Sequence, residues 1–299
     1  IARLSKAQRN LGIEVLNIHN VGLADGSAIR VWPSVDLDSI RPQSLRNFLF
    51  YAGAVWRAKS LPRNIPTILH VHGAWSDFLL SKVLAGAIGA QATFASIHSV
   101  ARPRLRWLYR LALSHCAEVL VTGKADQKFL AEAIGRDVVH LPSGVASEFA
   151  EAPDGYQVPN QFDVISVGNF LTRKRLDIVV ECARFRPQLR FAIVGDGPTR
   201  PVIEAMIAES RIRNVSLLGR QPARAVASLL RGSKLFLSTS EEEGAPTAAL
   251  EAMAVGLPVV LAPSNDFTWL VNPGVNGIIT KDWTVAEFVD AIDTILKDE

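Results

Sequence analysis

The sequence predicts an α/β protein with two doubly wound, mainly parallel sheets in tandem, for three reasons. Short apolar runs alternate with amphipathic stretches of helical length along most of the 299 residues. The segment 150–161, with two prolines, a glycine and polar residues at its ends, interrupts this alternation. The length also suits two domains at roughly 150 residues each. We expect an N-terminal domain over residues 1–158, a C-terminal domain over residues 159–299 and a ligand cleft between them.

The first half of the chain contains the first set of expected elements. Strands are expected over residues 14–18, 67–71, 92–97, 119–122 and 138–141, and helices over 45–59, 77–87, 104–116 and 124–134. The stretch 83–101 contains no Asp, Glu, Lys or Arg, but polar residues and glycines interrupt it. We interpret it as a helix end followed by a buried strand, not as a membrane span.

The second half repeats this alternation. Strands are expected over residues 163–167, 189–194, 215–218, 235–237 and 258–261, and helices over 175–184, 199–210, 223–230 and 246–255. A further helical pattern covers residues 284–299. Strands that alternate with helices favour a parallel sheet that is covered on both faces.

The first residues also have a helical pattern. Ile1, Leu4, Ala7 and Leu11 recur at helical spacing before Gly12. Domains rarely begin inside a helix, so we expect the chain to be truncated at both ends, with an opening strand and turn upstream of residue 1.

Composition and charge exclude several classes of protein. With 48% hydrophobic and 20% charged residues, the chain is neither disordered, collagen-like nor a coiled coil. Its two cysteines cannot form a disulfide scaffold, and no signal peptide is visible, so a cytoplasmic location is expected. Residues 1–150 carry 17 Lys and Arg against 10 Asp and Glu, a formal charge of +7, whereas residues 151–299 carry −4. The basic half is a candidate surface for an anionic partner.

The most informative stretch is residues 238–260, STSEEEGAPTAALEAMAVGLPVV. An expected strand is followed by a polar loop with Gly244, which allows close backbone approach to a ligand, and Pro246 suits the first position of a helix. The free amides of that helix start favour a phosphate. Glu243 and Glu251 suit sugar hydroxyls on either side of it. A solvated acidic loop and an exposed helical Glu explain the same residues.

Two further turns follow expected strands. Arg173, Lys174 and Arg175 open a helix after Gly168, where cations oppose the helix dipole unless an anion binds there. The ordinary alternative is a solvated basic turn. The turn VGDGP at residues 194–198 lacks the third glycine of a dinucleotide fingerprint, so we interpret it as mainly structural.

Together these motifs resemble the donor-binding domain of family 4 glycosyltransferases, which are retaining enzymes of the GT-B fold. The resemblance rests on residues 168–174, the turn 195–198 and the Glu-x7-Glu spacing from Glu243 to Glu251. In the first half, HVHG at 70–73, SIHS at 96–99 and LPSGV at 141–145 follow the family's order and spacing. The resemblance implies an acceptor-side Rossmann-like domain followed by a nucleotide-sugar donor domain.

The resemblance assigns a role to each matching residue. It implies that Glu243 holds the donor sugar, Lys174 binds the diphosphate, Glu251 binds the ribose and His98 faces the donor sugar, so His98, Lys174 and Glu243 are the candidate catalytic residues. The remaining expected donor-binding residues are Gly168 and Asn169 after the first strand, Gly219, Arg220 and Gln221 beside the nucleobase, and Gly244, Ala245, Pro246 and Thr247 around the diphosphate. The family often has Arg where Asn169 stands, so Arg173 is expected to complete the diphosphate clamp.

Two patterns suggest metal sites. Asp36-x-Asp38 matches a metal motif of a different glycosyltransferase fold, but a lone D-x-D is common. His70-x-His72 has no apparent third ligand, and we interpret it as one buried histidine and one loop histidine. We therefore expect neither a metal nor any other cofactor, only the UDP- or GDP-linked sugar as substrate.

The segment RPRLRWLYR at residues 102–110 suggests a membrane surface. On a helix, its cations would rest on an anionic bilayer; these are Arg102, Arg104, Arg106 and Arg110. We interpret its aromatic residues as packing inward. No nucleic-acid-binding module accompanies the patch.

The resemblance thus implies a retaining glycosyltransferase of the hexosyl type, and the cations near the expected diphosphate site lead us to expect that it needs no metal. The expected acceptor is a glycan or a lipid-linked molecule in bacterial cell-surface polysaccharide or glycolipid synthesis. The expected location is the cytoplasm, with a peripheral position on the inner face of the cytoplasmic membrane as a further expectation. A sugar-nucleotide epimerase of the same fold is an alternative, although the first half offers few acids. A non-catalytic nucleotide-sugar-binding protein is the other.

Overall fold

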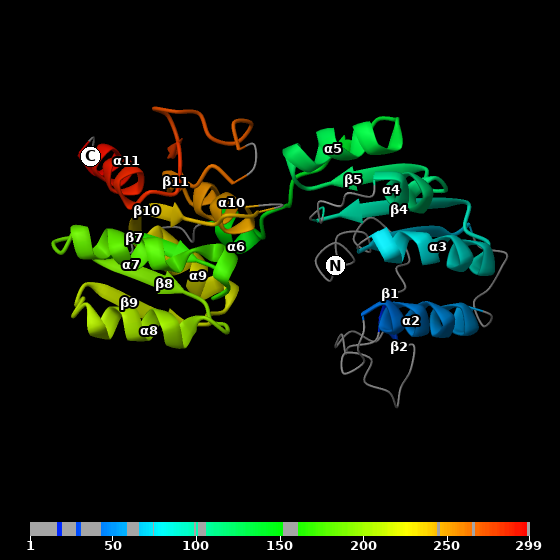
Figure 1. Cartoon of the computed structure of the whole chain (residues 1–299), viewed down its shortest axis with the longest axis horizontal. Coiled ribbons are helices and arrows are strands. Elements are labelled where there is room, and N and C mark those ends of the chain that lie inside the picture. The colour runs from blue at the N-terminus through cyan, green and yellow to red at the C-terminus, as the bar shows by residue number, and fades with distance from the viewer. Residues whose placement is uncertain are drawn as a thin grey trace. The chain divides into compact units, whose positions relative to one another are not determined.

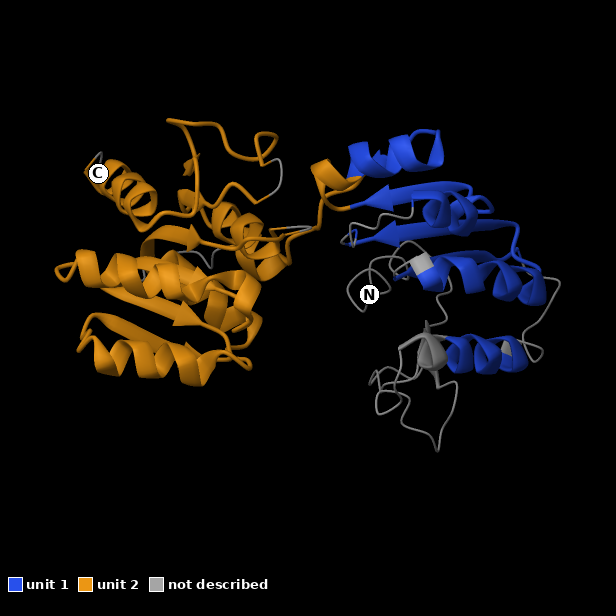
Figure 2. Ribbon diagram, in the orientation of Figure 1, with its two compact units in different colours: residues 1–121, 127–139 blue, residues 122–126, 140–299 orange. Residues whose placement is uncertain are grey.

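The computed structural model describes residues 17–19, 28–30, 43–58, 66–73, 75–98, 100, 106–151, 161–243, 246–264 and 267–297. The chain divides into two compact units (Figure 2). Unit 1 comprises residues 1–121 and 127–139, and unit 2 comprises residues 122–126 and 140–299.

A four-stranded sheet of order β3–β4–β5–β6 forms the centre of unit 1. Its strands are β3 (Ile68–His72), β4 (Ala92–Ile97), β5 (Glu118–Val121) and β6 (Val139–His140). The helices are α2 (Gln43–Ala58), α3 (Trp75–Ile88), α4 (Arg106–Leu113) and α5 (Lys124–Ile134). A separate parallel pair joins β1 (Asn17–His19) to β2 (Ala28–Arg30). The strands β3, β4 and β5 pair in parallel, so that their carboxyl ends share one edge of the sheet.

Unit 2 contains a six-stranded parallel sheet of order β12–β11–β10–β7–β8–β9 (Figure 1). Its strands are β7 (Phe162–Val167), β8 (Phe191–Val194), β9 (Val215–Gly219), β10 (Ser233–Ser238), β11 (Val259–Leu261) and β12 (Gly277–Ile279). Its helices are α6 (Ser147–Ala150), α7 (Leu176–Phe185), α8 (Arg200–Glu209), α9 (Ala223–Arg231), α10 (Thr247–Ala254) and α11 (Val285–Lys297), and a 3-10 turn, η2, spans Thr172–Lys174.

Successive residues of the central strands of unit 2 point to opposite faces of the sheet. Val164 and Leu235 pack in one core with α7, α8 and α11, whereas their neighbours Ile165 and Phe236 pack in a second core with α6, α9 and α10. All four side chains are almost fully buried. Both faces of the sheet are covered, and for this reason the central strands are apolar at nearly every position.

Most of the expected elements are confirmed. The strand at 92–97 and the helix at 124–134 agree residue for residue, and the interpretation of residues 83–101 as a helix end and a strand is correct. The α/β class with parallel sheets is also correct. Sequence reasoning missed β2, β12, α6 and η2, which have only three or four residues each. Such short elements have too few positions to establish a hydrophobic period.

The segment before the expected linker packs on unit 2. Arg231 of α9 donates hydrogen bonds to the carbonyls of Glu148, Phe149 and Glu151, and Phe149 is buried in the second core. Residues 152–160 of the linker and the expected helix at 1–11 lie outside the described residues. The domain boundary after residue 158 stays a prediction.

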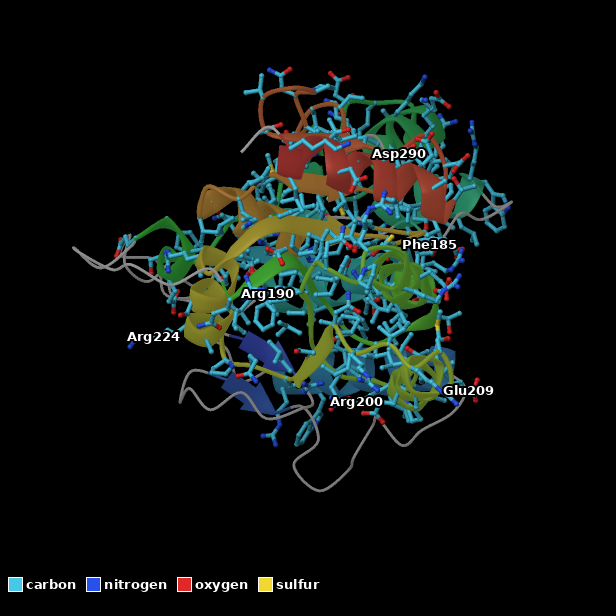
Figure 3. All side chains as sticks on the ribbon, turned by 90° about the vertical axis from the view of Figure 1, so that its left-hand side faces the viewer. Phe185, Arg190, Arg200, Glu209, Arg224 and Asp290 are labelled. Atoms are coloured by element: carbon cyan, nitrogen blue, oxygen red, sulfur yellow. The ribbon has the colours of Figure 1, made fainter. Side chains whose placement is uncertain are left out.

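The outer helices of unit 2 present charged side chains to solvent. Figure 3 shows Arg200 and Glu209 on α8, Arg224 on α9 and Asp290 on α11 at the periphery of the fold. In the described part of the chain, no helix combines the length and apolar character that crossing a membrane requires.

Candidate functional site

The strand order of unit 2 brings two loops together. The chain passes from β7 to β8 and β9 on one side of the sheet, whereas β11 and β12 extend it beyond β10 on the other. The neighbouring strands β7 and β10 pair in parallel, so the loops that follow them leave the same edge side by side. Open α/β sheets bind ligands where the strand order reverses in this way.

Lys174, in the loop after β7, forms an ion pair with Glu243, in the loop after β10. Their side chains are only 16% and 12% exposed. Ser240 donates a hydrogen bond from its Oγ to Oε1 of Glu243 at 3.0 Å, which helps to satisfy the carboxylate. The structure thus brings together a cation and a carboxylate that sequence reasoning had treated as separate contacts to a diphosphate and a sugar.

Glycines allow the loops after β7 and β8 to lie close together. A Cβ on Gly195, which has φ +136°, would lie 1.8 Å from the carbonyl oxygen of Gly168. The side chain of Lys174 passes near Gly168, because a Cβ there would lie 3.7 Å from its Cε. The interpretation of residues 194–198 as a tight strand-to-helix turn is correct, and this turn packs against the backbone at Gly168.

The basic turn differs from the prediction in two ways. Arg173 and Lys174 belong to η2, and Arg175 has a left-handed conformation before α7 begins at Leu176, so these residues do not open the helix. The expected mismatch with the helix dipole is also wrong for Arg175, because Asp177 and Glu241 neutralise its charge. These hydrogen bonds raise the pKa of Arg175.

Arg173 lies beside the same loop after β10. Its Nη1 donates to the carbonyl oxygen of Glu242 at 2.7 Å. Asn169 is exposed in the loop after β7, next to Gly168. Arg173 thus contacts the loop that contains Glu243, and the diphosphate role of Arg173 and Asn169 stays a prediction.

The expected helix start after β10 is confirmed with one correction. Pro246 immediately precedes α10, which begins at Thr247, so Pro246 caps the helix and is not its first residue. Glu251 lies in the second turn of α10 and is half-buried. Gly244 and Ala245 lie outside the described residues.

Gly219 ends β9, and Arg220 and Gln221 follow it at the same edge of the sheet, two strands from β7. The amide of Gly195 donates to the carbonyl oxygen of Gly219 at 2.8 Å. This hydrogen bond joins the end of β9 to the turn after β8. Gln221 donates to the carbonyl oxygen of Leu218 at 2.7 Å, and Arg220 is exposed. Their nucleobase role stays a prediction.

Three histidines gather at one sheet edge of unit 1. His70 and His72 are both half-buried on β3, so the assignment of one to a loop is wrong. Nδ1 of His72 lies 3.1 Å from Nε2 of His98, which follows β4, and their rings stack. Burial, with smaller effects from His70 and His98, lowers the pKa of His72 to about 4. Sequence reasoning missed the His72–His98 contact, for which two histidine motifs at neighbouring strand ends were the available signal.

Helix α4 corrects the interpretation of its aromatic residues. Tyr109 packs inward, as expected, but Trp107 is 60% exposed. Leu111, one turn further on, and the residues Arg106 and Arg110 are also exposed. Arg106 forms an ion pair with Glu132 at 3.4 Å. Arg102 and Arg104 lie outside the described residues.

The described ranges contain no candidate metal site. Within them, no three His, Cys, Asp or Glu side chains are grouped so as to hold a metal ion. His70 and His72 are thus not part of such a group. Asp36 and Asp38 lie outside the described residues.

The fold is that of an α/β protein with parallel sheets, and the Lys174–Glu243 pair lies where such sheets usually bind ligands. A family model described as "Glycosyl transferases group 1" matches residues 150–299, the half of the chain that contains the Lys174–Glu243 pair. The chain belongs to this family.

Individual relatives agree with this assignment. The chain is 26% identical to alpha-D-kanosaminyltransferase of Streptomyces kanamyceticus over 272 residues, which cover 80% of this chain and 70% of that protein. Three of the curated relatives are matched over 43% to 70% of their own lengths.

Solved structures share the fold. The sucrose-phosphate synthase of Thermosynechococcus elongatus has a TM-score of 0.80 at 18% identity, and the match covers 99% of this chain and 83% of that one. Anabaena HepE in complex with UDP and glucose has a TM-score of 0.69 at 20% identity, covering 83% of this chain and 72% of that one.

Proposed function

We propose that the chain transfers a hexosyl group from a UDP- or GDP-sugar to a glycan or lipid-linked acceptor with retention of anomeric configuration. The proposed setting is bacterial cell-surface polysaccharide or glycolipid synthesis. The observation that carries this proposal is the partly buried Lys174–Glu243 pair where the strand order of unit 2 reverses. A solved structure of the same fold contains UDP and glucose, which supports a uridine nucleotide as the first donor to test.

The proposed donor contacts follow from the chemistry of the side chains. The ammonium of Lys174 and the guanidinium of Arg173 bind the diphosphate, and the carboxylate of Glu243 accepts hydrogen bonds from sugar hydroxyls. Each such charge-assisted contact contributes about 1.5–3 kcal/mol. Glu251 accepts hydrogen bonds from the ribose. The other proposed donor contacts are the loop residues Gly168 and Asn169, the base-lining residues Gly219, Arg220 and Gln221, and the helix start Gly244, Ala245, Pro246 and Thr247.

The proposed reaction is a same-face displacement. The acceptor oxygen forms a bond to the anomeric carbon as the bond from that carbon to the phosphate oxygen breaks, and the acceptor proton passes to the departing diphosphate. Negative charge therefore grows on the diphosphate, where Lys174 and Arg173 stabilise it. These cations do the work that a metal does elsewhere, so the proposed transfer is independent of metal. His98 is proposed to face the donor sugar.

We also propose that α4 holds the enzyme at an anionic membrane surface, as a peripheral protein on the cytoplasmic side. Trp107 and Leu111 offer exposed apolar area, and Arg106 and Arg110 supply positive charge on the same helix. Arg102 and Arg104 extend this patch in the sequence.

The experiment is a donor screen with and without acceptors. The protein is incubated with UDP- and GDP-sugars and a panel of lipid-linked and soluble glycans, nucleotide release is measured, and NMR determines the anomeric configuration of the product. Lys174→Ala should abolish release, whereas Lys281→Ala, at a lysine whose side chain is 88% exposed, should not. Conversion of the donor without nucleotide release would indicate an epimerase, and binding without either reaction would indicate a non-catalytic sensor.

A further inference from the structure

Arg175 has an unusual backbone conformation beside the proposed diphosphate contact. Its φ of 48° and ψ of 44° place it in the left-handed region, which residues other than Gly rarely adopt. The residue links η2, which contains Lys174, to the first residue of α7. The direction in which the side chain of Lys174 points therefore depends on this disfavoured backbone conformation.

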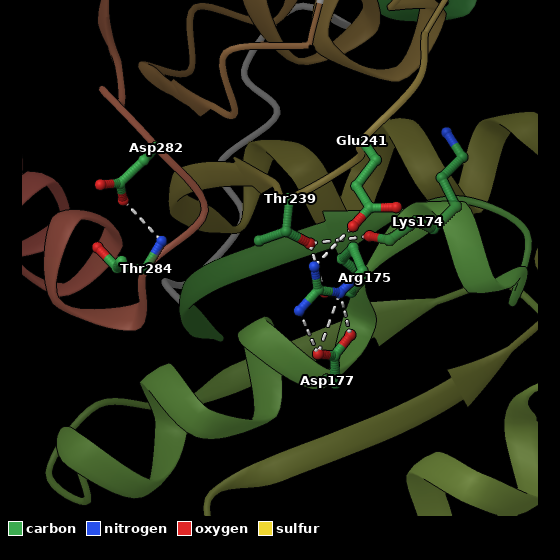
Figure 4. Close-up of polar contacts among 7 residues, drawn as sticks. All are labelled: Lys174, Arg175, Asp177, Thr239, Glu241, Asp282 and Thr284. Atoms are coloured by element: carbon green, nitrogen blue, oxygen red, sulfur yellow. Dashed lines mark hydrogen bonds and ion pairs between the residues drawn. The ribbon is translucent and has the colours of Figure 1, made fainter.

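The side chain of Arg175 joins this turn to two other elements (Figure 4). Nη1 donates to Oε1 of Glu241 at 2.7 Å in the loop after β10. Nε and Nη2 donate to the carboxylate of Asp177 at 3.0–3.2 Å, in the first turn of α7. A guanidinium that is shared between two carboxylates has a fixed direction, because its donors form a rigid planar fork.

Hydrogen bonds to backbone carbonyls also join the turn after β7 to the loop after β10. Thr239, which is 1% exposed, has a single hydroxyl hydrogen. Its Oγ1 lies 2.9 Å from the carbonyl oxygen of Lys174 and 2.8 Å from that of Arg175, so the two carbonyls share this donor. The amide of Glu241 donates to the carbonyl oxygen of Arg173 at 2.8 Å. The loop that contains Glu243 and the turn that contains Lys174 are thus also joined at the residues directly before and after Lys174.

We propose that Arg175 is a positioning residue. Its ion pairs with Asp177 and Glu241 stabilise the left-handed turn, and this turn directs the side chain of Lys174 toward a bound diphosphate. Its guanidinium is already committed to two carboxylates, so it acts through Lys174 and does not contact the ligand. This inference rests on the proposed donor site of Lys174 and adds the residue that controls its direction.

The first test compares ligands with and without a diphosphate. Calorimetry measures the affinity of the full chain for UDP, uridine, GDP and guanosine. In Arg175→Gly, which permits the left-handed backbone but removes the guanidinium, the affinity for the preferred diphosphate should fall at least about fivefold, and the affinity for the matching nucleoside should change less than about twofold. Glu241→Gln weakens the contact between Arg175 and Glu241 from the other side. It should give a smaller loss of diphosphate affinity, with little change in nucleoside affinity. Arg184→Ala, which removes an ordinary ion pair within α7, should change neither affinity.

The second test asks whether Arg175 acts through Lys174. In a double-mutant cycle, Arg175→Gly should weaken diphosphate binding no further once Lys174→Ala is present. An additional full loss in the double variant would overturn the proposal in favour of direct contact. A parallel loss of diphosphate and nucleoside binding would reduce Arg175 to a structural role. If Lys174→Ala itself leaves UDP and GDP affinity unchanged, the proposed donor site fails and the positioning role fails with it. A loss in Lys174→Ala with none in Arg175→Gly would overturn the positioning role alone.

Discussion

Lys174 and Glu243 are 69 residues apart in the chain, yet their charged groups are in contact at the end of two neighbouring strands. In this pair, each charge already has a partner. A diphosphate that binds Lys174 and a sugar that binds Glu243 would therefore take the place of an internal contact, and the site keeps its charged side chains ordered before the ligand arrives. Such preorganisation lowers the conformational cost of binding.

Replacing Glu251 by Ala should weaken binding of UDP, GDP and their sugars while the protein stays folded. The proposed ribose contact is a charge-assisted hydrogen bond, so an affinity loss of roughly tenfold is expected. Calorimetry of the nucleotides measures it, with Glu209→Ala on α8 as a control at an exposed carboxylate. Unchanged affinity for all the nucleotides would refute the ribose role.

Turnover should survive an excess of EDTA. The proposed mechanism assigns the stabilisation of the leaving diphosphate to Lys174 and Arg173, which EDTA does not remove. Nucleotide release is measured before and after chelation. Loss of activity that magnesium or manganese restores would show that a metal is required.

The protein should bind vesicles containing anionic lipid more strongly than neutral vesicles, and the difference should shrink as salt is added. Trp107→Ala should weaken binding to both kinds of vesicle, because it removes exposed apolar area that the proposal places in the bilayer surface. Replacing Arg106 and Arg110 by Gln should remove mainly the preference for anionic lipid. Cosedimentation measures binding, and Val202→Ala, at an exposed valine on α8, is the control. Equal binding to both vesicles would leave α4 as an ordinary surface helix.

Stability should fall as the pH is lowered from about 6.5 toward 4. The folded protein holds the pKa of His72 at about 4, below the ordinary 6.5, so between these values the unfolded chain binds the proton more readily. The free energy of unfolding should decrease by at most about 1.4 kcal/mol per pH unit from this group. Urea unfolding at several pH values measures the slope, and His72→Asn should flatten it. An identical slope in the variant would assign the effect to other groups.

Adding one methyl group should have opposite effects at two glycines. Gly195→Ala should destabilise the protein by about 1–3 kcal/mol, because the new Cβ would overlap the carbonyl oxygen of Gly168 and the φ of +136° is unfavourable. Gly86→Ala, inside α3 with open space around it, should stabilise by roughly 0.5–1 kcal/mol. Urea unfolding compares the two variants, and a neutral Gly195→Ala would mean that the loop after β8 relaxes freely.

The parallel sheets and most helices were predictable because their apolar residues repeat with a clear period. Val164 and Ile165 lie in different cores, and a strand with apolar residues on both faces indicates a buried parallel sheet. The site residues Lys174 and Glu243 were predictable singly, from the motifs that contain them. Their contact was not, because it depends on the pairing of β7 with β10, and a strand's neighbours are not written in its own sequence.

Other features had no local signal. The left-handed turn at Arg175 was missed because Gly is the usual sign of that conformation, and here two carboxylates stabilise it. The stacking of His72 on His98 depends on the register of β3 and β4, in which His72 lies opposite Ser96. The exposure of Trp107 was misjudged because the amphipathic pattern of α4 does not show how far the neighbouring elements cover each side of the helix.

The connection made by Thr239 has a consequence for the order of folding. The contacts of its hydroxyl with Lys174 and Arg175 close a loop of 64–65 residues. This loop contains α7, β8, α8, β9, α9 and β10, which must already have taken their places. Contacts this distant in the chain form late, because the entropy of closing a long loop opposes them until the intervening elements are packed. Nucleotide affinity should therefore appear only at the end of refolding, so that time-resolved nucleotide binding would serve as a sensor of completed assembly of this sheet.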